Sequence, residues 1–289
     1  MPKSSALISA LLITLAWLPE SASAVDRSLA IIEAGVQDSE DAPFVPSDYQ
    51  FLPGEFVYST FKIAGFTVKS EDRGAVERIS LGYEVTPQDS KGIALASPTS
   101  GTIEVEVNPE DKNWMPMRRC SFLIPSYVAA GEFRIHVVAK DLFSGTEAAK
   151  DVPFRIGGTV VQLVDKVAVQ NFRFLRQEND RHALDVAAYR PGDTVHISFE
   201  VIGYKLGPQN QYRLAYTVTV LRPDGKPFLP QPQTGELAAS TFYPAQFVPA
   251  NFNLTTSGDS ARGEYIILLT IRDLIGNQFY QMREPFSLE

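Results

Sequence analysis

The sequence predicts an all-β protein in which one antiparallel β-sandwich domain occurs twice in tandem, and two observations carry this prediction. The first is an internal repeat, since residues 51–66 return without a gap as residues 189–204. The second is an alternation of apolar and polar residues with period two in both copies, whereas a helical period is hard to find after residue 24. Such a repeat indicates two copies of one structural unit in a single chain.

The repeat extends beyond its best segment, and it preserves turn residues and apolar positions. Both copies have a Pro-Gly-acid turn, at Pro53-Gly54-Glu55 and Pro191-Gly192-Asp193, which leads the chain into an alternating strand. Further correspondences are Leu81–Val85 with Leu214–Val218, Trp114–Pro116 with Phe247–Pro249, and Gly131–Leu142 with Gly263–Leu274. Polar residues that could do chemistry mostly differ between the copies. The repeated residues therefore specify a scaffold.

The strands of the first copy follow from the alternation and from the turn residues between the apolar runs. They are expected at Leu29–Ile32, Glu55–Phe66, Arg78–Thr86, Thr102–Val107, Met117–Leu123, Gly131–Asp141 and Val152–Ile156. About seven short antiparallel strands in roughly 130 residues are typical of an immunoglobulin-like or fibronectin-III-like sandwich.

Each strand is expected to turn one face to the core and the other to water, as antiparallel sheets allow. The inward residues of the best strand are Val195, Ile197, Phe199 and Val201. Those of the strand after Gly131 are Phe133, Ile135, Val137 and Ala139.

The chain resembles the broad class of exported bacterial proteins that are built from tandem immunoglobulin-like modules. The resemblance rests on the Pro-Gly-acid-x-Val turn, on the Gly-Glu-aromatic start of the strands at Gly131 and Gly263, and on the aspartates that end them, Asp141 and Asp273. It covers the chain after residue 24 at the level of the fold and matches no single characterised family. It implies a non-catalytic module and carries over no site residues.

The first 24 residues have the pattern of a secretory signal peptide. Lys3 precedes the apolar stretch 6–18, and Ala22-Ser23-Ala24 offers the small residues that a signal peptidase reads before Val25. The stretch is too short for a membrane span, which needs roughly 20 apolar residues, so no span is expected in the mature chain. The expected organisation is a signal peptide at 1–24, one domain at 25–157 and a second at 158–289, exported to the periplasm or beyond the cell.

Charge and residue content argue against several functions. A net charge of −8 disfavours binding to nucleic acid. The single cysteine, Cys120, allows no intramolecular disulfide, and His136, His182 and His196 lack the spacing of metal ligands. We therefore expect no cofactor, no metal centre, no catalytic residues and no enzymatic activity. The acidic loops at 38–41 and 110–111 leave a weak cation site open.

Two surfaces are candidates for partner contacts. Trp114, Met115 and Met117 lie in an irregular stretch and could form a recognition patch. The competing interpretation is that Trp114, like its aligned residue Phe247, plugs the open end of its sandwich.

The second candidate surface is an apolar strip. Ile266 and Leu268 stand on the outward face of their strand, where the first copy has Arg134 and His136. A monomer rarely leaves such a strip bare, so the first domain, another protomer or a partner should cover it.

Taken as a whole, the sequence predicts an exported, non-catalytic binding or assembly module that contacts an envelope or extracellular protein or a glycan through loops and exposed sheet faces. Two alternatives stay open at this point. One is a carbohydrate-binding accessory protein, which would show an exposed aromatic platform. The other is a pilus-type periplasmic chaperone, which lends a strand to its client and should carry a basic pair in the cleft between its domains.

Overall fold

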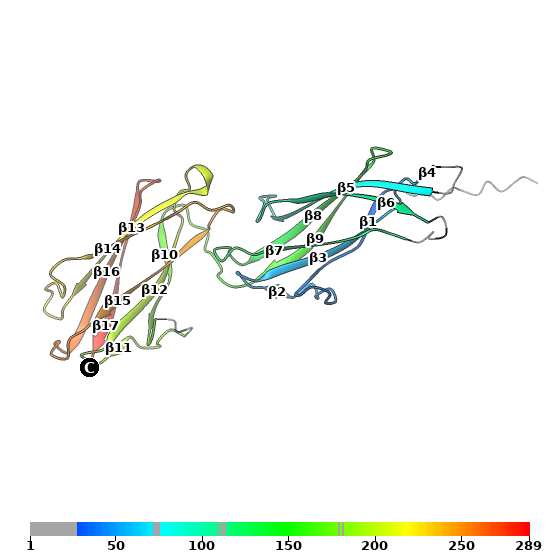
Figure 1. Cartoon of the computed structure of the whole chain (residues 1–289). Coiled ribbons are helices and arrows are strands. Elements are labelled where there is room, and N and C mark those ends of the chain that lie inside the picture. Colours follow the sequence, from blue (N-terminus) through cyan, green and yellow to red (C-terminus); the bar gives the residue numbers. More distant parts are fainter. Residues whose placement is uncertain (1–27, 72–75, 109, 111–113, 179, 181) are drawn as a thin grey trace, which may run out of the picture.

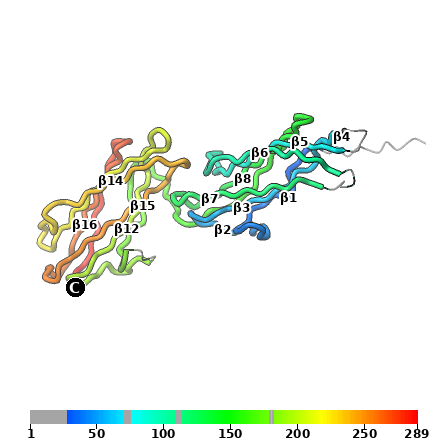
Figure 2. The backbone as a smooth tube through the Cα atoms, viewed as in Figure 1, coloured from blue at the N-terminus to red at the C-terminus, as the bar shows by residue number. Residues whose placement is uncertain are grey.

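The computed structural model describes residues 28–71, 76–108, 110, 114–178, 180 and 182–289. The predicted signal peptide and its cleavage site lie outside these residues. Figure 1 and Figure 2 show two β-rich bodies placed end to end, one formed by each half of the chain. No helix of the described residues is long and apolar enough to cross a membrane.

The first half folds as two facing sheets. Its three-stranded sheet has the order β1 (Ala30–Gln37), β3 (Phe56–Ala64), β7 (Met117–Leu123). Its six-stranded sheet has the order β2 (Gln50–Phe51), β9 (Glu147–Ile156), β8 (Gly131–Asp141), β5 (Val76–Asp89), β4 (Lys69–Glu71), with β6 (Thr99–Val107) also paired to β5.

The second half repeats this arrangement except that β4 has no counterpart. Its three-stranded sheet has the order β10 (Ala168–Leu175), β12 (Thr194–Ile202), β15 (Phe247–Thr255). Its five-stranded sheet has the order β11 (Ala188–Tyr189), β17 (Gln278–Leu288), β16 (Gly263–Asp273), β13 (Tyr212–Leu221), β14 (Gln233–Ala239). The only helical element in the described part of the chain is a 3-10 turn, η2, at Pro208–Asn210. The predicted all-β, immunoglobulin-like class is confirmed.

The strands predicted for the first half are all present, with shifted ends. The prediction missed β2, β4 and β11. β2 and β11 are two-residue strands that pair in parallel with β9 and β17 and extend the larger sheet of each half. The predicted inward faces are confirmed, because every apolar residue named for them is buried.

Both halves carry the same irregularity in their first strand. The pairing register shifts between Ile32 and Gly35 in β1, and between Gln170 and Arg173 in β10. Glu33 and Asn171, inside the two shifts, have positive φ angles of 45° and 52°. A β-bulge at the same place in each half bends the edge strand over the core.

A buried aspartate ends the equivalent strands β8 and β16. Asp141 accepts the N–H of Thr67 at 2.7 Å and that of Phe143 at 2.8 Å. Asp273 accepts the N–H of Lys205 at 2.9 Å and that of Ile275 at 3.0 Å. Each carboxylate thus ties a hairpin to the segment that follows the central strand of the opposite sheet.

The pKa of Asp141 reflects two opposing effects. Burial alone would raise it, but the hydrogen bonds from Thr67, Phe143 and Ser144 stabilise the charged form and together hold the pKa below its ordinary value.

Each half has its own hydrophobic core, enclosed between its two sheets. Between them, β9 ends at Ile156 and β10 begins at Ala168, so residues 157–167 link the two halves. The domain boundary after residue 157 and the origin of the halves by duplication stay predictions.

Candidate functional site

The two halves meet through an apolar cluster. Ala129, from the segment after β7, packs with Ile202 at the end of β12 and Phe247 at the start of β15, and all three are buried. Val161 and Ala168 pack against them. A contact of this kind restricts the motion that two linked domains otherwise have.

One aromatic side chain crosses the junction. Tyr243 belongs to the second half but is buried in the core cluster of the first, where it is 1% exposed. Its hydroxyl donates a hydrogen bond of 3.1 Å to Oδ2 of Asp89, and it accepts one of 3.3 Å from Nε2 of Gln246. Burial raises the pKa of Tyr243, and the charge of Asp89 raises it further, so the hydroxyl stays protonated and can donate.

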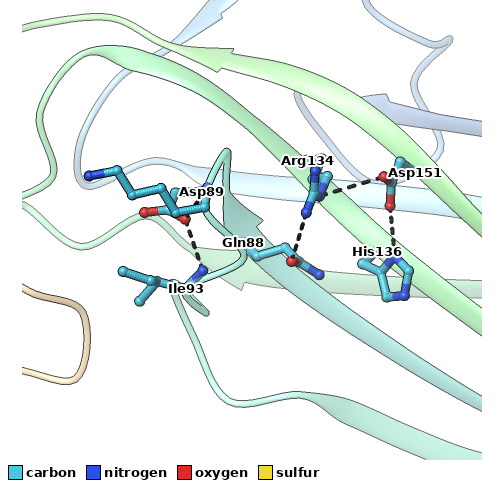
Figure 3. Close-up of polar contacts among 7 residues, drawn as sticks. Gln88, Asp89, Ile93, Arg134, His136 and Asp151 are labelled. Atoms are coloured by element: carbon cyan, nitrogen blue, oxygen red, sulfur yellow. Dashed lines mark hydrogen bonds and ion pairs between the residues drawn. The ribbon is translucent and has the colours of Figure 1, made fainter.

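The loop after β5 also holds the side chain of Asp89 in place. Its Oδ1 accepts the N–H groups of Lys91 at 2.9 Å and Ile93 at 2.8 Å, and Figure 3 shows the contact with Ile93 in the loop after β5. These two hydrogen bonds therefore orient the carboxylate that accepts the hydroxyl of Tyr243.

The linker is held to the second half by Glu200. This buried carboxylate accepts hydrogen bonds from Thr159 at 3.2 Å, from Gln170 at 2.9 Å and from Asn171 at 2.8 Å. In addition, the N–H of Ala130 donates to the carbonyl of Thr159 at 2.8 Å. The described junction contacts are thus apolar packing and hydrogen bonds. None of them involves the basic pair that the chaperone alternative requires.

The outer face of the larger sheet in the first half carries a row of polar side chains (Figure 3). Nδ1 of His136 lies 2.6 Å from Oδ1 of Asp151, and Nε of Arg134 lies 3.6 Å from Oδ2 of the same carboxylate. Arg134 also donates from Nη2 to Oε1 of Gln88 at 3.3 Å. Asp151 therefore orients the imidazole, but among the described residues no hydroxyl or thiol is hydrogen-bonded to His136 that could serve as a nucleophile.

The equivalent face of the second half is apolar around Ile266, which pairs with Leu221 on β13 and with Pro285 on β17. Leu268 is the next outward residue of β16, and its partners are polar, Thr219 on β13 and Arg283 on β17. Both Ile266 and Leu268 are half-buried, between residues of the same strand that are fully buried. The predicted outward orientation is confirmed, and neither residue belongs to the apolar cluster that joins the two halves.

β7 begins with Met117 at the end of the first half that is remote from the junction, and Trp114 and Met115 come just before it in the chain (Figure 1). Trp114 is 38% exposed and Met117 is 41% exposed, whereas Met115 is half-buried. Among the described residues, Trp114 is not one of the side chains that pack on the first core. The plug interpretation stays a prediction.

The alignment of Trp114 with Phe247 is wrong by one residue. Lys62 pairs with Met117, and its counterpart Glu200 pairs with Pro249, so Met117 corresponds to Pro249. Phe247 therefore corresponds to Met115.

The remaining candidate groups are not brought together. His182 is exposed, and Nδ1 of His196 lies 2.9 Å from Oδ1 of Asn253 on the other sheet's outer face. Burial raises the pKa of the Cys120 thiol to about 11, so the thiol is a poor nucleophile at neutral pH. The described residues contain no group of three or more histidines, cysteines or acidic residues that could hold a metal ion.

No protein-family model and no curated protein matches the chain. Three solved structures illustrate its structural similarity. The C-terminal domain of the Streptococcus agalactiae AgI/II polypeptide BspA is 13% identical, with 90% of this chain and 99% of that chain covered and a TM-score of 0.29. The C-terminal domain of the Streptococcus pyogenes antigen I/II-family protein AspA is 11% identical, with 89% and 97% covered and a TM-score of 0.27. Dimeric latent PorU from Porphyromonas gingivalis is 16% identical, with 89% of this chain but 24% of that chain covered and a TM-score of 0.30. Similarities of this size do not indicate what this chain binds or does.

Proposed function

We propose that the protein is an exported, non-catalytic binding or assembly module, made of two sandwich domains at 25–157 and 158–289. In this proposal the domains are held in a fixed relation by the junction, and they contact a partner in the cell envelope or outside the cell through loops and sheet faces. The observation that carries the proposal is the contrast between the equivalent outer faces of β8 and β16.

The contrast matters because the first half shows what the scaffold requires at these positions. Arg134 and His136 occupy the same places on β8 that Ile266 and Leu268 occupy on β16, and the sandwich forms with either pair. Apolar residues on the outer face of β16 are therefore not needed for folding. An apolar strip that the fold does not need is typical of a contact surface.

The fixed junction supports the same proposal. Tyr243, Asp89 and the cluster around Phe247 limit hinge motion, so a partner meets surfaces of both domains without first having to order them. A rigid tandem pair is well suited to assembly at the cell surface.

The test replaces Leu268 by lysine. Complete burial of a leucine side chain contributes about 1.5–3 kcal/mol, so Leu268→Lys should weaken association at least about tenfold. Association is measured by light scattering for self-assembly, and by binding to a purified envelope partner identified through cross-linking. The matched control is His136→Lys, the same change at the equivalent position of the first half, which should leave association and the circular dichroism spectrum unchanged. Equal association by both variants and the parent would sink the proposal.

A further inference from the structure

A groove of about 620 Å³ opens on the second half, at the end remote from the first half. It lies where β12 begins, at Thr194, whereas the other end of this strand, at Ile202, is at the junction. The groove is lined by the turn that precedes β12, by Arg176 just after β10, and by Glu289.

Two guanidinium groups and two carboxylates line the groove. Arg176 and Arg190 both line it, and in the described part of the chain neither guanidinium has an ion-pair or hydrogen-bond partner. In the described part of the chain neither lining carboxylate forms an ion pair with Arg176 or Arg190, and each accepts a hydrogen bond from a neutral donor nearby. Oδ2 of Asp193 accepts the backbone N–H of Arg190 at 2.8 Å, and Oε1 of Glu289 accepts the hydroxyl of Ser287 at 3.1 Å. A guanidinium is a planar donor suited to a carboxylate or a phosphate.

Small polar side chains continue the groove across the sheet. Thr194 and His196 line it, and each meets a polar side chain of β15. The hydroxyls of Thr194 and Thr255 are 3.3 Å apart, and Nδ1 of His196 lies 2.9 Å from Oδ1 of Asn253. Hydroxyl, amide and imidazole groups can each donate and accept, which suits the hydroxyls of a sugar.

The first half has a different chemistry at the same place. The counterparts of Thr194 and Thr255 are Phe56 and Leu123, which pair directly across β3 and β7 and are each about half exposed, at 50% and 48%. By the same correspondence Asp38 stands in place of Arg176, and Leu52 in place of Arg190. The polar, arginine-lined groove is therefore a property of the second half alone and is not required by the sandwich.

We propose that this groove binds an acidic saccharide. The carboxylate of a uronic acid would lie against Arg176 and Arg190, and the ring hydroxyls would bind Thr194, His196 and the adjoining side chains of β15. This surface is separate from the strip at Ile266 and Leu268, so the binding proposed there and the binding proposed here are tested by different variants.

The experiment is a calorimetric titration of the chain from Val25 onward with three acidic probes: trigalacturonate, an alginate trisaccharide and a hyaluronan tetrasaccharide. At least one should bind saturably, and the neutral trisaccharide cellotriose should not. Arg176→Gln and Arg190→Gln should each weaken that binding about tenfold or more, since each removes a charge-assisted pair. The control is Arg173→Gln, which removes a positive charge from β10 outside the groove and should bind as the parent does.

Four results would overturn the proposal. Failure of all three acidic saccharides to bind excludes the ligand class, and unchanged binding by both groove variants excludes the location. Inorganic phosphate that binds as tightly as the best saccharide would reduce the groove to a general anion site. Hexaglutamate that binds as tightly would instead assign the groove to acidic peptides.

Discussion

Apart from the extra strand β4 in the first, residues 30–156 and 168–288 have the same order of strands. They also share the bulge in the first strand and the buried aspartate at the end of an equivalent strand. Their outer surfaces, in contrast, have little in common. Arg134 and His136 on β8 join a polar row, whereas Ile266 and Leu268 at the same positions of β16 form an apolar strip. The comparison distinguishes the residues that the sandwich fold requires from surface residues that can vary without changing the fold.

The groove at the start of β12 is a second place where the surfaces of the halves differ. Thr194 and Arg190 there replace Phe56 and Leu52, with no change in the order of the strands. Many core and turn positions recur in both halves, although Ser59 and Ile197 differ at a buried position. The outward positions of β8 and β16 and those of the groove differ in polarity. We therefore look for function in the residues by which the halves differ.

The largest loss of stability is expected at the junction, where Tyr243 enters the core of the first half. Tyr243→Ala should cost about 3–5 kcal/mol, because it removes a buried aromatic ring from the first core. Urea unfolding measures the loss, and small-angle scattering should show a wider range of interdomain distances. Tyr243→Phe keeps the ring, so it should lose about 1 kcal/mol and keep the parent's scattering profile. An alanine variant as stable and as compact as the parent would contradict the fixed junction.

The buried aspartates test whether the halves share a scaffold. Asp141→Ala and Asp273→Ala each remove several part-buried hydrogen bonds from backbone N–H groups to a carboxylate, and such bonds to a charged group contribute about 1.5–3 kcal/mol each. Each variant should therefore lose on the order of 3 kcal/mol in the half that carries it. Hydrogen exchange resolves which half is destabilised. A large loss for one aspartate and none for the other would show that the equivalence is only geometric.

The stability that Asp141 contributes should depend on pH. The pKa of Asp141 is below its ordinary value in the folded state, so its contribution to stability is fully present above the ordinary carboxyl pKa and is lost as the pH falls through the folded value. The stability difference between the parent and Asp141→Ala should thus shrink in acid. Urea midpoints from pH 7 to pH 2 measure it, and a difference that grows as the pH falls would contradict the assignment.

A smaller effect should appear where the halves differ by one hydroxyl. The hydroxyl of Tyr265 donates to the carbonyl of Ala261 at 2.8 Å, in the manner of the tyrosine corner of immunoglobulin-like domains, whereas the equivalent residue of β8 is Phe133. Tyr265→Phe should therefore lose about 1 kcal/mol. Thermal unfolding measures this loss, and an unchanged midpoint would mean that the bond contributes nothing.

Much of the fold was predictable because strands with one wet face produce a period of two in the sequence. The core residues of β12 and β8 and the outward orientation of Leu268 follow directly from it. The two-residue strands β2 and β11 were missed, because two residues in a parallel pair leave no periodic signal and depend on tertiary contacts.

The surfaces were less predictable than the core. The insertion of Tyr243 into the other half and the groove beside Arg190 arise from irregular segments, in which no pattern shows where a side chain points. The alignment of Trp114 with Phe247 failed for a related reason, since it matched aromatic residues next to a loop and the true register is set by strand pairing.

We propose that the outer face of β16 serves contact and not folding. The most direct measurement gives this face the residues of the other half, through the double variant Ile266→Arg/Leu268→His, and compares stability with association. Because both side chains are half-buried, the free energy of unfolding should fall by only about 1 kcal/mol, while association is lost. A variant that unfolds, or one that associates as tightly as the parent, would contradict it.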